Sequence, residues 1–117
     1  MPETLLIQSG SLEAKARVLH LSGRLEAAGA QRLRQQCLGL RGQGMLRIVL
    51  ELSGLTFVAS SGLGTFLLLT EEFGHAGGKV VLAAPGESVL SVIKLLNLDK
   101  FLNIEESLDR AIAAAQK

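Results

Sequence analysis

The 117-residue sequence contains one cysteine, no tryptophan or tyrosine, and four phenylalanines. Because Cys37 stands alone, an intrachain disulfide is excluded and a metal site built from cysteines is not expected. The lack of Trp and Tyr removes the aromatic side chains on which single-stranded nucleic acids usually stack. Basic residues are scattered along the chain and the formal net charge is +1, so direct nucleic-acid binding is not expected.

Long apolar runs are also lacking, although 48% of the residues are hydrophobic. No unbroken run approaches the ~20 residues of a membrane helix, so membrane insertion is not expected. The start, Met-Pro-Glu-Thr-Leu-Leu, lacks the basic patch and apolar block of a secretory signal, which predicts a cytoplasmic location. A chain of this length can bury about two thirds of its unfolded surface, which favours a single domain over residues 1–117.

The spacing of the apolar residues predicts strands that alternate with helices after an initial hairpin. A turn is expected at Gly10 and Ser11, between the first two strands. This order is typical of the α/β class, with a mixed β-sheet of about four to five strands and about four helices packed on it. Strands are predicted over residues 4–8, 16–22, 45–52, 80–84 and 101–104, and helices over residues 27–40, 63–73, 88–96 and 105–116.

The most informative segment, residues 54–64, reads Gly-Leu-Thr-Phe-Val-Ala-Ser-Ser-Gly-Leu-Gly. Extended backbone is expected to continue to Val58, so Ser60 and Ser61 fall where the next helix leaves its first N–H groups unpaired. Serine is a favoured N-cap residue, which gives Ser60 a purely structural interpretation. Such a helix end also attracts anions, and a phosphate there would add roughly −1.5 to −2 charges. Ser60 is therefore predicted to be either a helix cap or a phosphoacceptor.

Other patterns give little support for catalysis or for a cofactor. The pair Gly62-x-Gly64 lacks the third glycine of a dinucleotide fingerprint, and no phosphate-loop lysine follows it. His20 and His75 have no second histidine at metal-ligand spacing. A triad of Ser60, His75 and Asp99 would lack the Gly-x-Ser-x-Gly elbow of serine hydrolases. We therefore expect no enzyme activity, no cofactor and no metal.

The stretch Ile48–Leu67 contains an apolar strand, a Ser-Ser-Gly loop and a helix start without a gap. On this stretch above all, the chain resembles the STAS superfamily, and most closely the stand-alone anti-sigma factor antagonists of bacteria. Leu21-Ser22-Gly23-Arg24-Leu25-Glu26 is similar to the family's early Gly-x-Leu-Asp segment. Residues 77–81 and 95–112 also fit, so the resemblance covers nearly the whole chain and implies the STAS fold.

This resemblance implies a switch protein without catalysis of its own. In the family, the first serine of Asp-Ser-Ser-Gly, here Ser60, is phosphorylated by an anti-sigma factor that is also an ATP-dependent serine kinase. The unphosphorylated antagonist binds that anti-sigma factor, which releases the sigma factor for transcription, and a metal-dependent serine phosphatase restores the hydroxyl. The resemblance implies a partner-binding or loop-supporting role for a further set of residues, namely Glu26, Ser61, Gly62, Leu63, Gly64 and Phe66.

The chain departs from the family pattern at two positions. Ala59 stands where phosphorylatable members usually have Asp, and Glu26 stands where the early Asp is usual. Losing the Asp removes a recognition feature for the kinase but also removes repulsion toward a phosphate on Ser60. Two alternatives therefore remain open: a non-phosphorylated interaction subunit of a stress-signalling or lipid-transport assembly, and a module that senses a small ligand or nucleotide.

Overall fold

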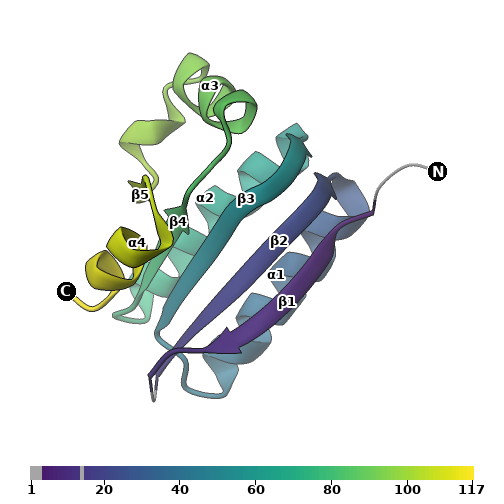
Figure 1. Cartoon of the computed structure of the whole chain (residues 1–117). Helices are drawn as coiled ribbons and strands as arrows, with labels where there is room; N and C mark the ends of the chain where they lie inside the picture. Colours follow the sequence, from purple (N-terminus) through teal and green to yellow (C-terminus); the bar gives the residue numbers. More distant parts are fainter. Residues whose placement is uncertain (1–3, 14) are drawn as a thin grey trace.

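The computed structural model describes residues 4–13 and 15–117; residues 1–3, on which the expected location partly depends, lie outside this part. Strand β1 (Leu6–Ser11) runs antiparallel to β2 (Ala16–Leu25). Strands β3 (Arg47–Val58), β4 (Lys79–Ala83) and β5 (Ile104–Glu105) then join in parallel, in the order β1-β2-β3-β4-β5 (Figure 1). The predicted mixed sheet with an initial hairpin is confirmed.

The helices lie on both faces of this sheet and at one end of it. Helices α1 (Ala27–Gly42) and α2 (Ser60–His75) lie behind the sheet in Figure 1, and α4 (Leu108–Ala115) lies in front of it. Helix α3 (Glu87–Leu95) follows the carboxyl end of β4 and leads into the short 3-10 helix η1 (Leu98–Lys100). The expected four α-helices are present among the described residues. None of the described helices has the length and apolar character needed to cross a membrane.

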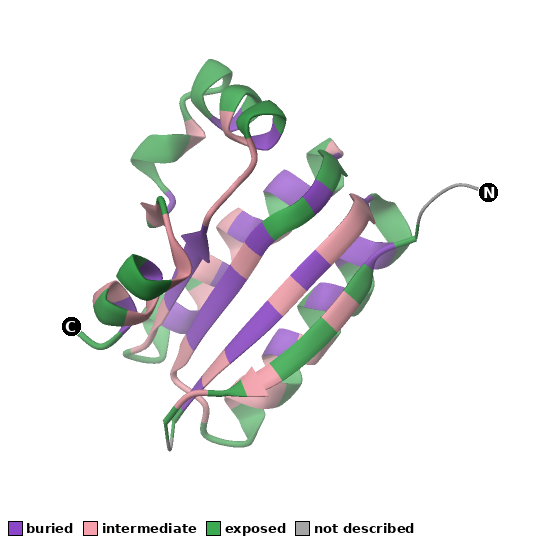
Figure 2. Cartoon of the chain, viewed as in Figure 1, coloured by how far each residue is buried: buried purple, intermediate pink, exposed green. Residues whose placement is uncertain are grey.

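Alternate residues of the central strands face two separate cores, as the twofold period of a strand requires. One face packs against α1 and α2, and the other packs against α4 (Figure 2). Ala111 and Ala115 let α4 lie close to the valines of that second face. Residues that pair across β2, β3 and β4 point to the same core. The first core contains Leu19, Leu50 and Leu82, and the second contains Val18, Val49 and Val81.

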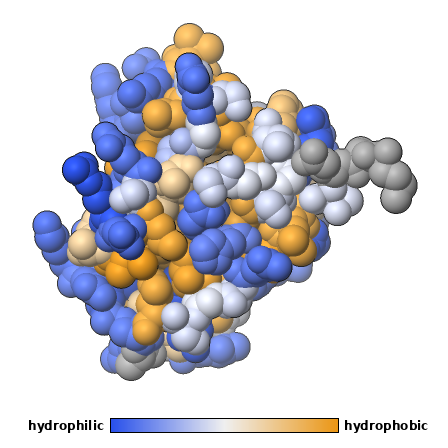
Figure 3. Space-filling view, viewed as in Figure 1, coloured by the Kyte–Doolittle hydropathy of each residue, from blue (hydrophilic) through white to orange (hydrophobic). Residues whose placement is uncertain are grey.

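The part of the front face formed by β1 and β2 has no helix over it (Figure 1). Leu6 is 52% exposed there, and the His20 Nδ1 atom lies 3.3 Å from the Glu51 Oε1 atom. Figure 3 shows hydrophilic side chains beside hydrophobic ones on this face rather than one continuous hydrophobic surface. Such a mixture is ordinary for one side of a sheet that contains antiparallel strands.

Several predicted boundaries differ from the structure by two or three residues, such as β1 at Leu6–Ser11 rather than residues 4–8 and α2 at Ser60–His75 rather than residues 63–73. The turn at Gly10 and Ser11 is wrong, because both residues continue β1 and pair with β2. The last strand lies at Ile104–Glu105 rather than over residues 101–104. The last helix begins at Leu108 rather than at residue 105, because residue 105 pairs with β4 and Ser107 then caps the helix.

Candidate functional site

The junction between β3 and α2 is held against the end of β2. Ala59 follows the last residue of β3 in an extended conformation, with φ −84° and ψ 169°. Its N–H donates to the carbonyl of Leu25 at 2.9 Å, which carries the pairing of β2 with β3 one residue beyond β3. Helix α2 begins at the next residue, Ser60. The chain therefore turns from strand to helix at a fixed point on the carboxyl edge of the sheet.

Ser60 is the first residue of α2, and Ala59 holds the N-cap position. Of the two roles predicted for Ser60, the helix cap is wrong, because a methyl side chain occupies the capping position and no side-chain cap bond forms. Ser60 and Ser61 are exposed, and neither hydroxyl makes a hydrogen bond within the described part of the chain. Both serine hydroxyls are therefore free to react or to contact a partner.

Some backbone N–H groups at this helix start also have no backbone hydrogen-bond acceptor among the described residues. The N–H groups of Gly62 and Leu63 both donate to the Ala59 carbonyl, at 2.9 and 3.1 Å. The N–H groups of Ser60 and Ser61 have no backbone acceptor within residues 4–13 and 15–117. With no acidic residue in the first turn, the partial positive charge of the helix start has no neighbouring carboxylate on its own helix.

The predicted site residues divide into exposed and buried groups. Ser60, Ser61 and Gly64 are exposed, whereas Leu63 is 5% exposed and Phe66 is fully buried. Gly62 is also buried, and a Cβ there would lie 2.7 Å from the Leu25 Cγ atom. Leu63 and Phe66 were predicted to bind a partner or to support the loop, and their side chains pack into the core beneath the junction, which favours the supporting role. They can support the loop from below.

Glu26, the remaining predicted residue, lies at the end of β2 beside a cationic group. It is exposed and precedes α1, where its backbone carbonyl accepts the Ala30 N–H at 2.8 Å. Its carboxylate is 3.4 Å from the Arg24 guanidinium. Glu26 therefore contributes its backbone to α1 and its side chain to an exposed ion pair.

Arg24 and Phe57 lie near the strand ends that lead to this junction, and they were not predicted as functional residues. They are partners in the β2–β3 register, and the Arg24 guanidinium lies 4.2 Å from the centroid of the Phe57 ring. This cation–π contact holds a positive charge at the carboxyl ends of the two strands that meet at Ala59. The sequence signal was weak, because Arg24 and Phe57 are far apart in the chain and only the strand register pairs them.

The rest of the described structure offers little for catalysis. Ser60 and His75 are the first and last residues of α2, so their backbones lie about 22 Å apart at ~1.5 Å per residue. A triad that includes both is therefore not formed. Among the described residues, no group of three His, Cys, Asp or Glu side chains could hold a metal ion.

Two side chains elsewhere have shifted pKa values. Burial raises the pKa of the Cys37 thiol to about 12, so the thiol is protonated at neutral pH. At Glu51, burial acts to raise the pKa, but hydrogen bonds from Ser53 and His20 and the charge of His20 outweigh it and lower the pKa. Cys37 is inside the core, and Glu51 lies on the front face of the sheet, so neither belongs to the Ser60 junction.

Comparison with known proteins links this geometry to one family. The STAS domain family matches residues 11–111, which is most of the chain. A protein of Thermotoga maritima that is provisionally named an anti-sigma factor antagonist is 28% identical over 75 residues. That alignment covers 64% of this chain and 66% of the Thermotoga protein.

Solved structures share the fold at lower sequence identity. The crystal structure of a provisionally named anti-sigma factor antagonist from Thermotoga maritima has a TM-score of 0.86 at 21% identity and covers 95% of both chains. The anti-sigma factor antagonist SpoIIAA in its unphosphorylated form has a TM-score of 0.81 at 22% identity, covering 95% of this chain and 96% of SpoIIAA. The Bacillus SpoIIAA has also been solved in a phosphorylated form, which matches with a TM-score of 0.73 at 22% identity, covering 93% of this chain and 98% of that one.

Proposed function

The chain belongs to the STAS domain family, and we propose that it acts as an anti-sigma factor antagonist whose partner binding is switched by phosphorylation of Ser60. Similar proteins carry the antagonist name, and one of them, SpoIIAA, is known in unphosphorylated and phosphorylated forms. In this proposal the chain binds an anti-sigma factor and thereby frees a sigma factor for transcription. It carries out no catalytic step of its own.

The observation that carries the proposal is the free Ser60 hydroxyl at the start of α2. A kinase needs an accessible serine whose hydroxyl is not already engaged, and Ser60 is exposed with no hydrogen bond in the described structure. The Ser107 hydroxyl, in contrast, accepts the Arg110 N–H at 3.2 Å at the start of α4. Modification of Ser60 would therefore disrupt no structural bond that the fold uses.

The surroundings of Ser60 are suited to hold a phosphate once it is attached. The unpaired N–H groups of Ser60 and Ser61 and the positive end of the α2 dipole favour an anion at this position. Arg24 adds a positive charge at the adjoining strand ends, and the Glu26 carboxylate, 3.4 Å from its guanidinium, offsets part of that charge. Ala59 contributes no carboxylate that would repel the phosphate. The modified protein should therefore remain folded and differ from the free form mainly in surface charge.

Phosphotransfer would come from a partner that combines anti-sigma factor and serine kinase. The Ser60 oxygen forms a bond to the γ-phosphorus of ATP, the bond to the β-phosphate oxygen breaks to give ADP, and the hydroxyl proton leaves to solvent or a kinase base. A serine phosphatase then hydrolyses the ester with water and restores the hydroxyl. Both catalytic steps belong to the partners.

The phosphate would weaken partner binding through charge. We expect the exposed residues Ser60, Ser61 and Gly64 to contact the anti-sigma factor. A phosphate within that contact must then lose its hydration without gaining an opposite charge from the anti-sigma factor. A loss of about 2–5 kcal/mol is typical when a charge is left unpaired in an interface. At ~1.4 kcal/mol per factor of ten, this loss weakens binding by more than tenfold.

Calorimetric titration of the anti-sigma factor tests this proposal. We expect Ser60→Asp to weaken binding by more than tenfold and Ser60→Ala to bind like the unmodified chain. Ser107→Asp is a control for added charge at another helix start, and it should leave binding unchanged provided that the variant is folded. Equal affinities of the unmodified chain and Ser60→Asp would contradict the switch.

Ala59 favours a second function, that of an interaction subunit which is not phosphorylated. The family's usual Asp is missing at this position, and the structure leaves the N-cap without a polar side chain. In that case the same exposed junction would bind its partner constitutively. A kinase that modifies a second antagonist of the same cell but not this chain would favour the interaction subunit.

A further inference from the structure

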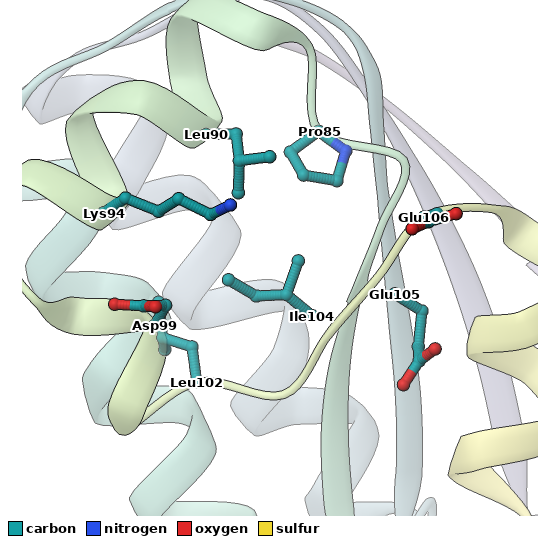
Figure 4. Close-up of a pocket in the computed structure, with 8 residues that line it drawn as sticks. All are labelled: Pro85, Leu90, Lys94, Asp99, Leu102, Ile104, Glu105 and Glu106. Carbon is teal, nitrogen blue, oxygen red and sulfur yellow. The ribbon is translucent and has the colours of Figure 1, made fainter.

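A hollow separate from the Ser60 junction lies at the carboxyl ends of β4 and β5. It has a volume of about 410 Å³ and is bounded by α3, the loop after β4 and the segment that joins η1 to β5 (Figure 4). This volume is near the lower end of the range for small-molecule sites, which is about 300–1,000 Å³. In open α/β sheets, ligands commonly bind beyond the carboxyl ends of the strands.

Apolar and charged side chains contribute equally to the lining of the hollow, with four residues of each kind. Pro85, Leu90 and Ile104 are half-buried and line it, and Leu102 is 6% exposed at its base. In Figure 4, Leu90 and Pro85 lie on one side of the open space and Ile104 and Leu102 on the other. A compact apolar group placed between them would cover hydrocarbon surface that water now contacts.

One positive charge, that of the exposed Lys94, lies beside the apolar residues of this hollow. The Lys94 side chain extends from α3 so that its amine ends beside Leu90, facing the gap above Ile104 (Figure 4). No carboxylate within the described residues pairs with this amine. An ammonium group next to an apolar wall is the arrangement that binds the head of an amphipathic anion.

The acidic residues of the lining restrict the charge of that anion. In Figure 4, the carboxylates of Asp99 and Glu105 are directed away from the gap, so they leave room for a ligand beside Lys94. Glu106 lies at the far rim, with its carboxylate 3.9 Å from the Arg110 guanidinium. Because the lining holds three carboxylates and a single ammonium group, each further negative charge on a ligand adds repulsion, which favours a ligand with one negative charge over a ligand with several.

We propose that this hollow binds a small monocarboxylate with a compact apolar body, its carboxylate on Lys94 and its body against Leu90, Leu102 and Ile104. A nucleoside triphosphate fits poorly, because its charges would face the acidic rim. The site does not depend on the phosphorylation of Ser60. The ammonium group of Lys94 and the four apolar residues favour an anion with an apolar body, and the three carboxylates limit that anion to a single charge.

Titration of the ¹⁵N-labelled chain by two-dimensional NMR tests the site. The probes are 3-methylbutanoate, its uncharged amide, and ATP. We expect 3-methylbutanoate to give saturable shifts at the amides of Leu90, Lys94 and Ile104. The uncharged amide should bind roughly tenfold more weakly, which is the effect of losing a hydrogen bond to a charged group. ATP should cause no saturable shift in this hollow.

Two variants separate this site from general surface binding. Lys94→Met keeps an unbranched side chain that is one heavy atom shorter and removes its charge, and it should weaken 3-methylbutanoate binding roughly tenfold. Lys100→Met removes a charge from η1, outside the lining, and should leave binding unchanged. Retained native spectra in both variants establish that they are folded. The site is refuted by absent or non-saturating shifts, by equal binding of the amide, by equal binding of Lys94→Met, or by tighter binding of ATP.

Discussion

The starts of α2 and α4 both carry serine, but the serine occupies different positions. At α4, Ser107 is the N-cap and its hydroxyl accepts the Arg110 N–H at 3.2 Å. At α2, Ala59 is the N-cap and Ser60 follows as the first helical residue with a free hydroxyl. A shift of one residue therefore separates a serine that stabilises its helix from one that is available to a kinase.

The two starts also differ at their third helical residue. Gly62 is buried at that position in α2, and its backbone lies against Leu25 and Val58, whereas Arg110 of α4 is exposed. At the α2 start, the side that faces the core is tightly packed at Gly62, whereas the exposed side carries serine hydroxyls without hydrogen bonds in the described structure. This combination keeps the backbone in place while Ser60 remains accessible.

Substitution of Gly62 by Ala should have the largest effect on the α2 start. The new Cβ would lie 2.7 Å from Leu25 Cγ and 2.8 Å from Val58 Cγ2, so the core must shift, at a cost of about 1–3 kcal/mol in the free energy of unfolding. The matched control is Gly64→Ala, where no atom lies within 4 Å. It should raise stability by up to about 1 kcal/mol through helix propensity. Urea denaturation measures both, and equal effects would contradict the packing difference.

Replacing each serine by alanine tests the two roles directly. Ser107→Ala removes a capping hydrogen bond and should lower the free energy of unfolding by about 1 kcal/mol. Ser60→Ala removes no hydrogen bond from an exposed position and should change it by less than about 0.5 kcal/mol. Thermal or urea denaturation measures the difference. A larger loss in Ser60→Ala than in Ser107→Ala would show that the roles are reversed.

Making the α2 start resemble that of α4 should give the smallest effect. Ala59 already has the extended backbone of an N-cap residue, so Ala59→Ser can accept the free Ser61 N–H without moving the chain. We expect a gain of up to about 1 kcal/mol in the free energy of unfolding, measured by denaturation. Ala59→Val, which adds no acceptor, is the control. A loss of stability in Ala59→Ser would mean that the capping position is not open.

The sequence predicted the sheet, its hairpin and the four helices, because each long element has a clear apolar period. Cys37 and Leu33, for example, recur at helical spacing and are both fully buried in the core. Boundaries were less predictable. The turn expected at Gly10 and Ser11 is part of β1, because cross-strand pairing with β2 outweighs the turn preference of these residues. The pairing of one strand with another does not show in the local sequence, so the end of β1 could not be predicted from Gly10 and Ser11 alone.

The candidate site was predicted in place but not in detail. The pattern Ser-Ser-Gly after an apolar strand located the junction, yet the serine preference favoured Ser60 as the N-cap, whereas the structure has Ala59 in that position. That choice depends on the Ala59 N–H bond to Leu25, a contact from another strand. The pairing of Arg24 with Phe57 was missed for the same reason. Phe66 is buried because it lies on the side of α2 that packs against the sheet, and the orientation of α2 on the sheet is not visible in the local sequence.

Mapping of phosphate after reaction with the partner kinase tests the central claim most directly. The pure chain is incubated with the anti-sigma factor kinase, magnesium and ATP, and peptides are sequenced by mass spectrometry beside those of Ser60→Ala and Ser107→Ala. We predict phosphate on Ser60 in the unmodified chain and in Ser107→Ala, and none in Ser60→Ala. Absence of phosphate from Ser60, with a kinase that is active on another antagonist, would contradict the proposed switch.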